Sequence, residues 1–244
     1  MLVISVNVFA SNEILIKYKK TKISLFDYTI LSDKNIESLR NVIIQAYPGV
    51  KFNLKGIKLC NLIKLPSTDT VKIKIIAKDK FFIFVSKKEI KDCHDSSIIP
   101  YLVVQNKEHF WPKIDGNHEE VGVFSLVWMG KNSSKISKEK WVRNIASIEV
   151  QSKPQQRDII ILPKNANDRE KQGFKIFEDN CSSCHSLNLV GQLEIGPDLN
   201  YPMNPLEYFS DKMFKKFIRN PQAVRYFKNA KMEGFDIRSR LVKH

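Results

Sequence analysis

The 244-residue chain contains no run of 18 or more apolar residues, so the sequence predicts no transmembrane helix. It has no internal repeat and no low-complexity tract, and its 43% hydrophobic content is enough for packed cores in one or two domains. Cysteine is scarce, with four residues. There is one C-x-x-C pair, and no second pair or His pair is present to complete a four-ligand zinc site around it.

Acidic residues are outnumbered by basic ones, 26 against 40, which gives a formal charge of +14. A basic protein first suggests nucleic acid as the partner. The lysines are, however, scattered through periodic apolar segments and do not cluster in one arm. We therefore predict no nucleic-acid binding, and expect a solvated basic surface that attracts acidic partner proteins.

One stretch carries a specific chemical signal. Cys181-Ser182-Ser183-Cys184-His185 fits the C-x-x-C-H pattern of c-type haem attachment. The two thiols can each add to one vinyl group of a haem, which gives two thioether bonds. The adjacent His185 is then held under the iron as the proximal ligand. The motif predicts one haem c, bound covalently through Cys181 and Cys184.

Two other kinds of site also use a C-x-x-C pair. A closed zinc site needs four nitrogen or sulfur ligands, and His185 would need an awkward local geometry to share the ion with Cys184. A thioredoxin-type dithiol usually lies at a strand-helix junction, whereas a helical pattern runs into Cys181. Zinc and a redox dithiol are the alternatives to haem.

The chain changes character at a polar linker, residues 151–163. Residues 13–150 contain short apolar stretches that are typical of β-strands, which predict an α+β, strand-dominated domain. Its clearest signal is the stretch 71–85, where apolar residues alternate with lysines and a turn at 78–80 leads into a second strand. Residues 164–244 are typical of helices and loops.

Two helix starts are predicted in the C-terminal part. Asn167 is expected to cap a helix, with Glu170 at the capping-box position. Ser210 is expected to cap a second helix, which runs to Arg219 and is ended by Pro221.

From about residue 165 onward the sequence resembles a small class I cytochrome c. The resemblance lies in Gly173-x-x-x-Phe177-x-x-x-Cys181, in the C-x-x-C-H motif and in residues 191–200 (GQLEIGPDLN). In that family a Gly-Pro-x-Leu segment wraps the proximal side of the haem, and the Pro carbonyl accepts a hydrogen bond from the ligand imidazole. The resemblance implies an all-α domain in which Pro197 orients His185. A simple turn at Pro197 is the alternative.

The family also uses a distal iron ligand, usually Met. Met213 lies on the apolar face of a predicted helix, and Met203 follows His185 by only 18 residues. Residues 231–235 (KMEGF) resemble the family's K-M-P-x-F ligand loop, so we predict Met232 as the distal ligand. Only 12 residues follow Met232, and the family's last helix is expected to be truncated.

Residues 20–150 weakly resemble the molybdopterin-binding domain of the sulfite oxidase family. The similar segments are NLKGIKLCNLI (53–63), IIAKDKFFIFVS (75–86), and FSLVWMG (124–130) followed by WVRNIASIEV (141–150). In the enzymes a Cys thiolate binds molybdenum. Cys60 does not stand at that position and Cys93 lacks the surrounding arginines. The resemblance therefore implies the fold without molybdopterin.

Two features concern the compartment. Cys60 and Cys93 could form a disulfide, but the apolar run IKLCNLI favours a buried free thiol at Cys60. Residues 2–10 (LVISVNVFA) are a short apolar run that resembles the end of a secretory signal peptide, although the basic n-region is absent. We interpret residues 1–12 as a signal remnant, with a first β-strand as the alternative. Export, to the periplasm in bacteria, also suits haem attachment of this kind.

These features predict an exported electron-transfer cytochrome with one covalent haem c, with acidic redox proteins as its partners and no enzymatic activity of its own. The alternatives are a molybdopterin-dependent oxidoreductase that passes electrons to its own haem, and a haem-based sensor or binding module.

Overall fold

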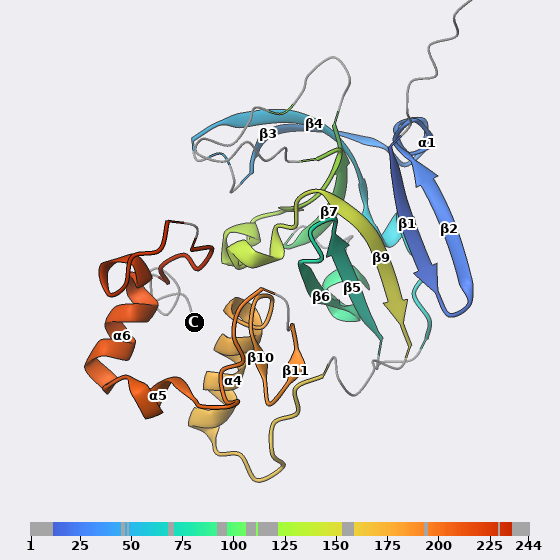
Figure 1. Ribbon diagram of the computed structural model, residues 1–244. Coiled ribbons are helices and arrows are strands. Elements are labelled where there is room, and N and C mark those ends of the chain that lie inside the picture. Colours follow the sequence, from blue (N-terminus) through green and yellow to red (C-terminus); the bar gives the residue numbers. More distant parts are fainter. Residues whose placement is uncertain are drawn as a thin grey trace, which may run out of the picture. The chain divides into compact units, whose positions relative to one another are not determined.

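The computed structural model describes residues 12–44, 47, 49–67, 71–91, 97–105, 111, 122–152, 159–192, 195–228 and 230–235. The predicted signal remnant, apart from residue 12, and Cys93 lie outside these ranges. The chain forms two compact units (Figure 1). One comprises residues 1–133 and 140–153, and the other comprises residues 134–139 and 154–244. The change from the first unit to the second at residues 153–154 falls within residues 151–163, and the grouping of residues 134–139 with the second unit has no signal in the sequence.

The N-terminal unit is strand-rich and contains a mixed five-stranded sheet with the order β2-β1-β9-β5-β6. Its strands are β1 (Glu13–Tyr18), β2 (Thr21–Phe26), β5 (Lys72–Ala77), β6 (Phe82–Ser86) and β9 (Ile145–Gln151). β1 pairs with β9 in parallel and the other pairs are antiparallel. The predicted hairpin is confirmed as β5 and β6, whose alternate residues Ile73, Ile75, Ile83 and Val85 are buried.

A second, antiparallel sheet has four strands in the order β3-β4-β7-β8. They are β3 (Glu37–Ile43), β4 (Lys51–Lys58), β7 (Ile99–Val104) and β8 (Phe124–Met129). In β7 and β8 consecutive residues are buried, so both faces of these two strands are covered. The side chains on one face belong to a hydrophobic cluster that includes Tyr101, Trp111 and Val127. This double burial explains why both strands are continuous apolar runs in the sequence.

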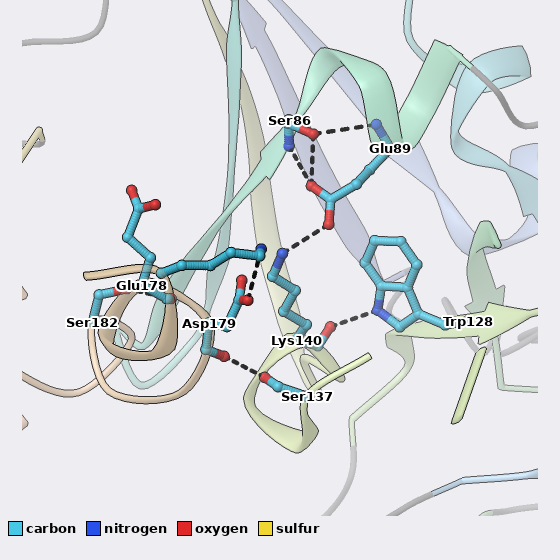
Figure 2. A network of polar contacts seen from close by, with 9 residues as sticks. Ser86, Glu89, Trp128, Ser137, Lys140, Glu178, Asp179 and Ser182 are labelled. Carbon is cyan, nitrogen blue, oxygen red and sulfur yellow. Dashed lines mark hydrogen bonds and ion pairs between the residues drawn. The ribbon is translucent and has the colours of Figure 1, made fainter. Parts of the chain in front are cut away.

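Short helices connect these strands. They are α1 (Asp27–Leu31), α2 (Leu59–Leu62), α3 (Lys87–Lys91) and the 3₁₀ turns η1 (Ser133–Lys135) and η2 (Lys138–Lys140). Lys140 is tied to the N-terminal unit, since its Nζ lies 2.7 Å from Glu89 Oε1 and its carbonyl accepts a hydrogen bond from Trp128 Nε1 at 2.8 Å (Figure 2).

The prediction of a buried free thiol at Cys60 is wrong. Cys60 is disulfide-bonded and half-buried. The apolar run around it ends β4 at Lys58 and turns into α2, which directs Leu59 and Ile63 into the core and leaves Cys60 at the surface of the turn. Cys181 and Cys184 are not in disulfide bonds. Cys93, the partner considered in the alternative prediction, lies outside the described residues.

The C-terminal unit consists of helices and loops with one two-stranded ladder. Its elements are α4 (Asp168–Asn180), β10 (Ser186–Leu187), β11 (Val190–Gly191), α5 (Pro205–Tyr208), α6 (Asp211–Arg219) and η4 (Pro221–Ala223). The ladder has two residues in each strand and adds to the predicted helices and loops. Both predicted helix starts are confirmed. Asn167 and Glu170 form a full capping box on α4, and Ser210 accepts a hydrogen bond from the Met213 N–H at the start of α6.

No helix in the described part of the chain is both long and apolar enough to cross a bilayer. None of the residues in α4, α5 and α6 is buried, and in α6 only Phe214, Phe217 and Ile218 are half-buried.

Candidate haem-attachment site

The C-x-x-C-H motif continues directly from the end of helix α4. The Cys181 N–H still bonds to the Phe177 carbonyl at 2.8 Å, as a helical residue does. The N–H groups of Cys184 and His185 then bond to the Cys181 carbonyl at 3.0 and 2.9 Å. This extra turn places Cys181 and Cys184 three residues apart on helical backbone, and such residues share one side of the turn.

The end of α4 is closed by side chains. Helix termini leave backbone carbonyls without intrahelical partners. Ser182 Oγ donates to the Glu178 carbonyl at 2.8 Å, and Ser137 Oγ donates to the Asp179 carbonyl at 2.5 Å (Figure 2). These bonds fix the backbone immediately before Cys181.

His185 is oriented from the side of its Nδ1 atom. Nδ1 lies 2.7 Å from the Pro197 carbonyl oxygen, which can only accept, so Nδ1 carries the proton. The Nε2 atom is then the one left to bind a metal. The Gly196 N–H reinforces the arrangement by donating to the Cys184 carbonyl at 2.7 Å. The contact between His185 and Pro197 that the resemblance implies is therefore present.

Gly196 is required by the space beside the imidazole. A Cβ at this position would lie 2.7 Å from both Cε1 and Nδ1 of His185, closer than real Cβ contacts. The backbone of residue 196 thus packs directly against the ring. The backbone of residue 196 and the Pro197 carbonyl together hold the ring edge that carries Nδ1. This arrangement is suitable for an imidazole that serves as a metal ligand.

The Asp198 carboxylate holds this loop together through hydrogen bonds, a role that sequence reasoning did not identify. Its carboxylate accepts hydrogen bonds from the Ser186 hydroxyl and from the N–H groups of Asn188, Leu189, Asn200 and Tyr201, at 2.7 to 3.2 Å. Partial burial by itself would raise the pKa of Asp198, but these hydrogen bonds outweigh it and lower the pKa below its ordinary value.

The Asp198 carboxylate also connects the turn at residues 188–189 to the segment that contains Pro197. Asn188 and Leu189 have positive φ angles of 54° and 60° and form the turn between β10 and β11. Asp198 receives their N–H groups and directly follows Pro197 in sequence. An Asx-turn residue in the segment GPDLN was the available sequence signal.

The apolar side chains of the C-terminal unit lack a protein core of their own among the described residues. Phe174 and Phe177 of α4, and Phe214 and Phe217 of α6, are only half-buried. Phe209 stacks on Phe217 with ring centroids 5.1 Å apart. A large planar apolar group such as haem would supply the surface against which these rings can pack, so the residues present fit a covalently bound haem.

The three candidate distal ligands have similar exposed fractions, 48% for Met203, 38% for Met213 and 37% for Met232. Exposure therefore does not distinguish between them, and Met232 stays a prediction. Its segment is anchored to α6, because the Phe235 N–H donates to the Ile218 carbonyl at 2.7 Å.

Comparison with known proteins agrees with the geometry. Residues 170–240 match the family model for cytochrome c. The match covers less than a third of the chain and begins inside α4. Over these residues the C-terminal unit is therefore similar to a cytochrome c domain, a class of protein domain that binds haem c covalently. The N-terminal unit has no such match, and its resemblance to sulfite oxidase has no support from the comparison. Among curated proteins, none matches the chain.

Proposed function

We propose that the protein is an exported electron-transfer cytochrome that binds one haem through thioether bonds to Cys181 and Cys184, with His185 as the proximal ligand. The observation that carries this proposal is the bond between His185 Nδ1 and the Pro197 carbonyl directly beside the C-x-x-C-H turn. When bound, the haem supplies a one-electron iron couple. The chain supplies attachment, orientation of the imidazole and the surroundings that set the potential.

Each residue has a separate task in this proposal. The Pro197 carbonyl accepts a hydrogen bond from the Nδ1–H group of His185, which increases the electron-donor strength of Nε2. Gly196 keeps the ring against the loop, and Asp198 holds that loop together. Met232 is proposed as the soft distal ligand, which favours the reduced state.

Export is supported by the disulfide at Cys60, because disulfides persist in oxidising compartments. A periplasmic location is the corresponding proposal for a bacterial protein. The excess of basic residues, 40 against 26 acidic ones, suits acidic redox partners.

The N-terminal unit is proposed to be non-enzymatic and free of molybdopterin. A cysteine in a disulfide has no thiolate to offer to molybdenum, so Cys60 is not available as a ligand in this state. Metal analysis of protein made in a host that synthesises molybdopterin provides the test. Stoichiometric molybdenum would contradict the proposal.

Haem attachment is tested on protein made in a host with c-type haem maturation. Acid-acetone extraction should leave the colour with the wild-type protein, and intact mass should show one added haem. A variant with both Cys181→Ala and Cys184→Ala should lose covalent haem, while Cys60→Ala should retain it. Haem that passes from the wild type into the organic phase would overturn the proposal.

A further inference from the structure

Residues 134–139 belong to the C-terminal unit although they precede the linker in sequence. Residues 134–139 lie between β8 and β9, with the N-terminal unit before and after them, yet they group with residues 154–244. The segment contains most of η1 and η2, and Ser137 lies between these two turns. The chain therefore passes from one unit to the other three times.

Ser137 makes the contact that ties this segment to α4. Its hydroxyl donates to the Asp179 carbonyl at 2.5 Å, across 42 residues of sequence (Figure 2). Asp179 is two residues before Cys181, in the last turn of α4. The neighbouring Glu178 carbonyl is satisfied locally, by Ser182. The closure of the helix end at Asp179 thus depends on a side chain from a distant part of the chain.

We propose that residues 134–139 are a positioning element of the haem-attachment site, in which Ser137 closes the end of α4. The proposal rests on the haem function proposed above. It assigns to Ser137 the role of holding the backbone that carries Cys181, Cys184 and His185.

The test is amide hydrogen exchange in the full-length protein with haem attached, measured at residues 181–185. Ser137→Ala should raise the exchange rates of these amides about fivefold, which is what the loss of one neutral hydrogen bond produces. Ser137→Thr keeps a hydroxyl and should restore slow exchange. Ser134→Ala is the matched control, because Ser134 is exposed in the same segment and its hydroxyl has no hydrogen bond among the described residues.

Unchanged exchange in Ser137→Ala, or equal exchange in the Ala and Thr variants, would overturn the positioning role. These outcomes are separate from a failure of the proposed function, because covalent haem in the wild type is established first by intact mass. Wild-type protein without covalent haem would instead refute the haem function itself.

Discussion

Replacing Gly196 by Ala would place a methyl group where the structure has no room for it. The new Cβ would lie 2.7 Å from Cε1 and Nδ1 of His185 and 2.8 Å from the Cys184 carbonyl oxygen. Ordinary contacts begin at 3.4 Å, so the ring or the loop must move by about 0.7 Å. The bond from Nδ1 to the Pro197 carbonyl, now 2.7 Å long, would then leave the normal range for a hydrogen bond.

Two measurable quantities should change in Gly196→Ala. Overpacking costs about 1–3 kcal/mol and a lost neutral hydrogen bond about 1 kcal/mol, so the free energy of unfolding of the C-terminal unit should fall by about 2–4 kcal/mol. The hydrogen bond from the imidazole also favours oxidised iron, because it strengthens the ligand as an electron donor. Weakening it should raise the reduction potential, by about 40 mV when about 1 kcal/mol distinguishes the two oxidation states.

Optical redox titration measures the potential, and denaturant unfolding followed at the haem absorbance measures stability. Gly173→Ala is the matched control. A Cβ at Gly173 has no neighbour within 4 Å, and Ala is the better helix former in α4. If Gly196→Ala keeps the wild-type potential and stability, the glycine is not needed for the contact between the loop and the imidazole, and the reasoning fails.

Three further predictions concern single side chains. Hydrogen bonds hold the pKa of Asp198 below its ordinary value, so its carboxylate stabilises the fold above that ordinary pKa, and the contribution is lost as the pH falls through the lowered pKa. Asp198→Asn should cost about 1–3 kcal/mol near pH 7 and make stability less dependent on pH in the acid range, as measured by denaturant unfolding across pH. Cys60→Ala should lower the stability of the N-terminal unit by about 2–4 kcal/mol, and peptide mapping of the wild type without reductant should find no free thiol at Cys60. Met232→Ala should abolish the weak near-infrared sulfur-to-iron band of the oxidised protein and lower its potential, whereas Met203→Ala and Met213→Ala should not; a band that survives Met232→Ala rules that ligand out.

The local parts of the fold were predictable because local chemistry decides them. Asn167 and Glu170 each accept a hydrogen bond from the other's backbone N–H, and these bonds do not depend on the surroundings. The start of α4 could therefore be predicted from these two residues. The hairpin of β5 and β6 follows from the alternation of apolar residues with lysines at residues 71–75, the turn at 78–80 and the apolar run at 81–85. The C-x-x-C-H turn and the Pro197 carbonyl likewise lie within a short stretch of sequence.

The parts that sequence reasoning missed depend on residues that meet only in the folded chain. Cys60 lies in an apolar run, but whether such a residue turns inward depends on where β4 ends and α2 begins. Asp198 is one acidic residue in a loop until the turn at Asn188 brings its N–H groups to the carboxylate. Ser137 and Asp179 have no sequence pattern in common, because their contact spans 42 residues.

The position of β9 has a consequence for the order in which the chain folds. In the five-stranded sheet, β9 lies between the hairpin of β1 and β2 and the hairpin of β5 and β6. Each hairpin can form early from neighbouring residues, but they join one sheet only when residues 145–151 arrive. The two strand edges that pair with β9 therefore stay unpaired until residues 145–151 have been synthesised. Ser137 becomes available immediately before β9, so the sheet is completed and the partner for the end of α4 is in place before α4 itself is made.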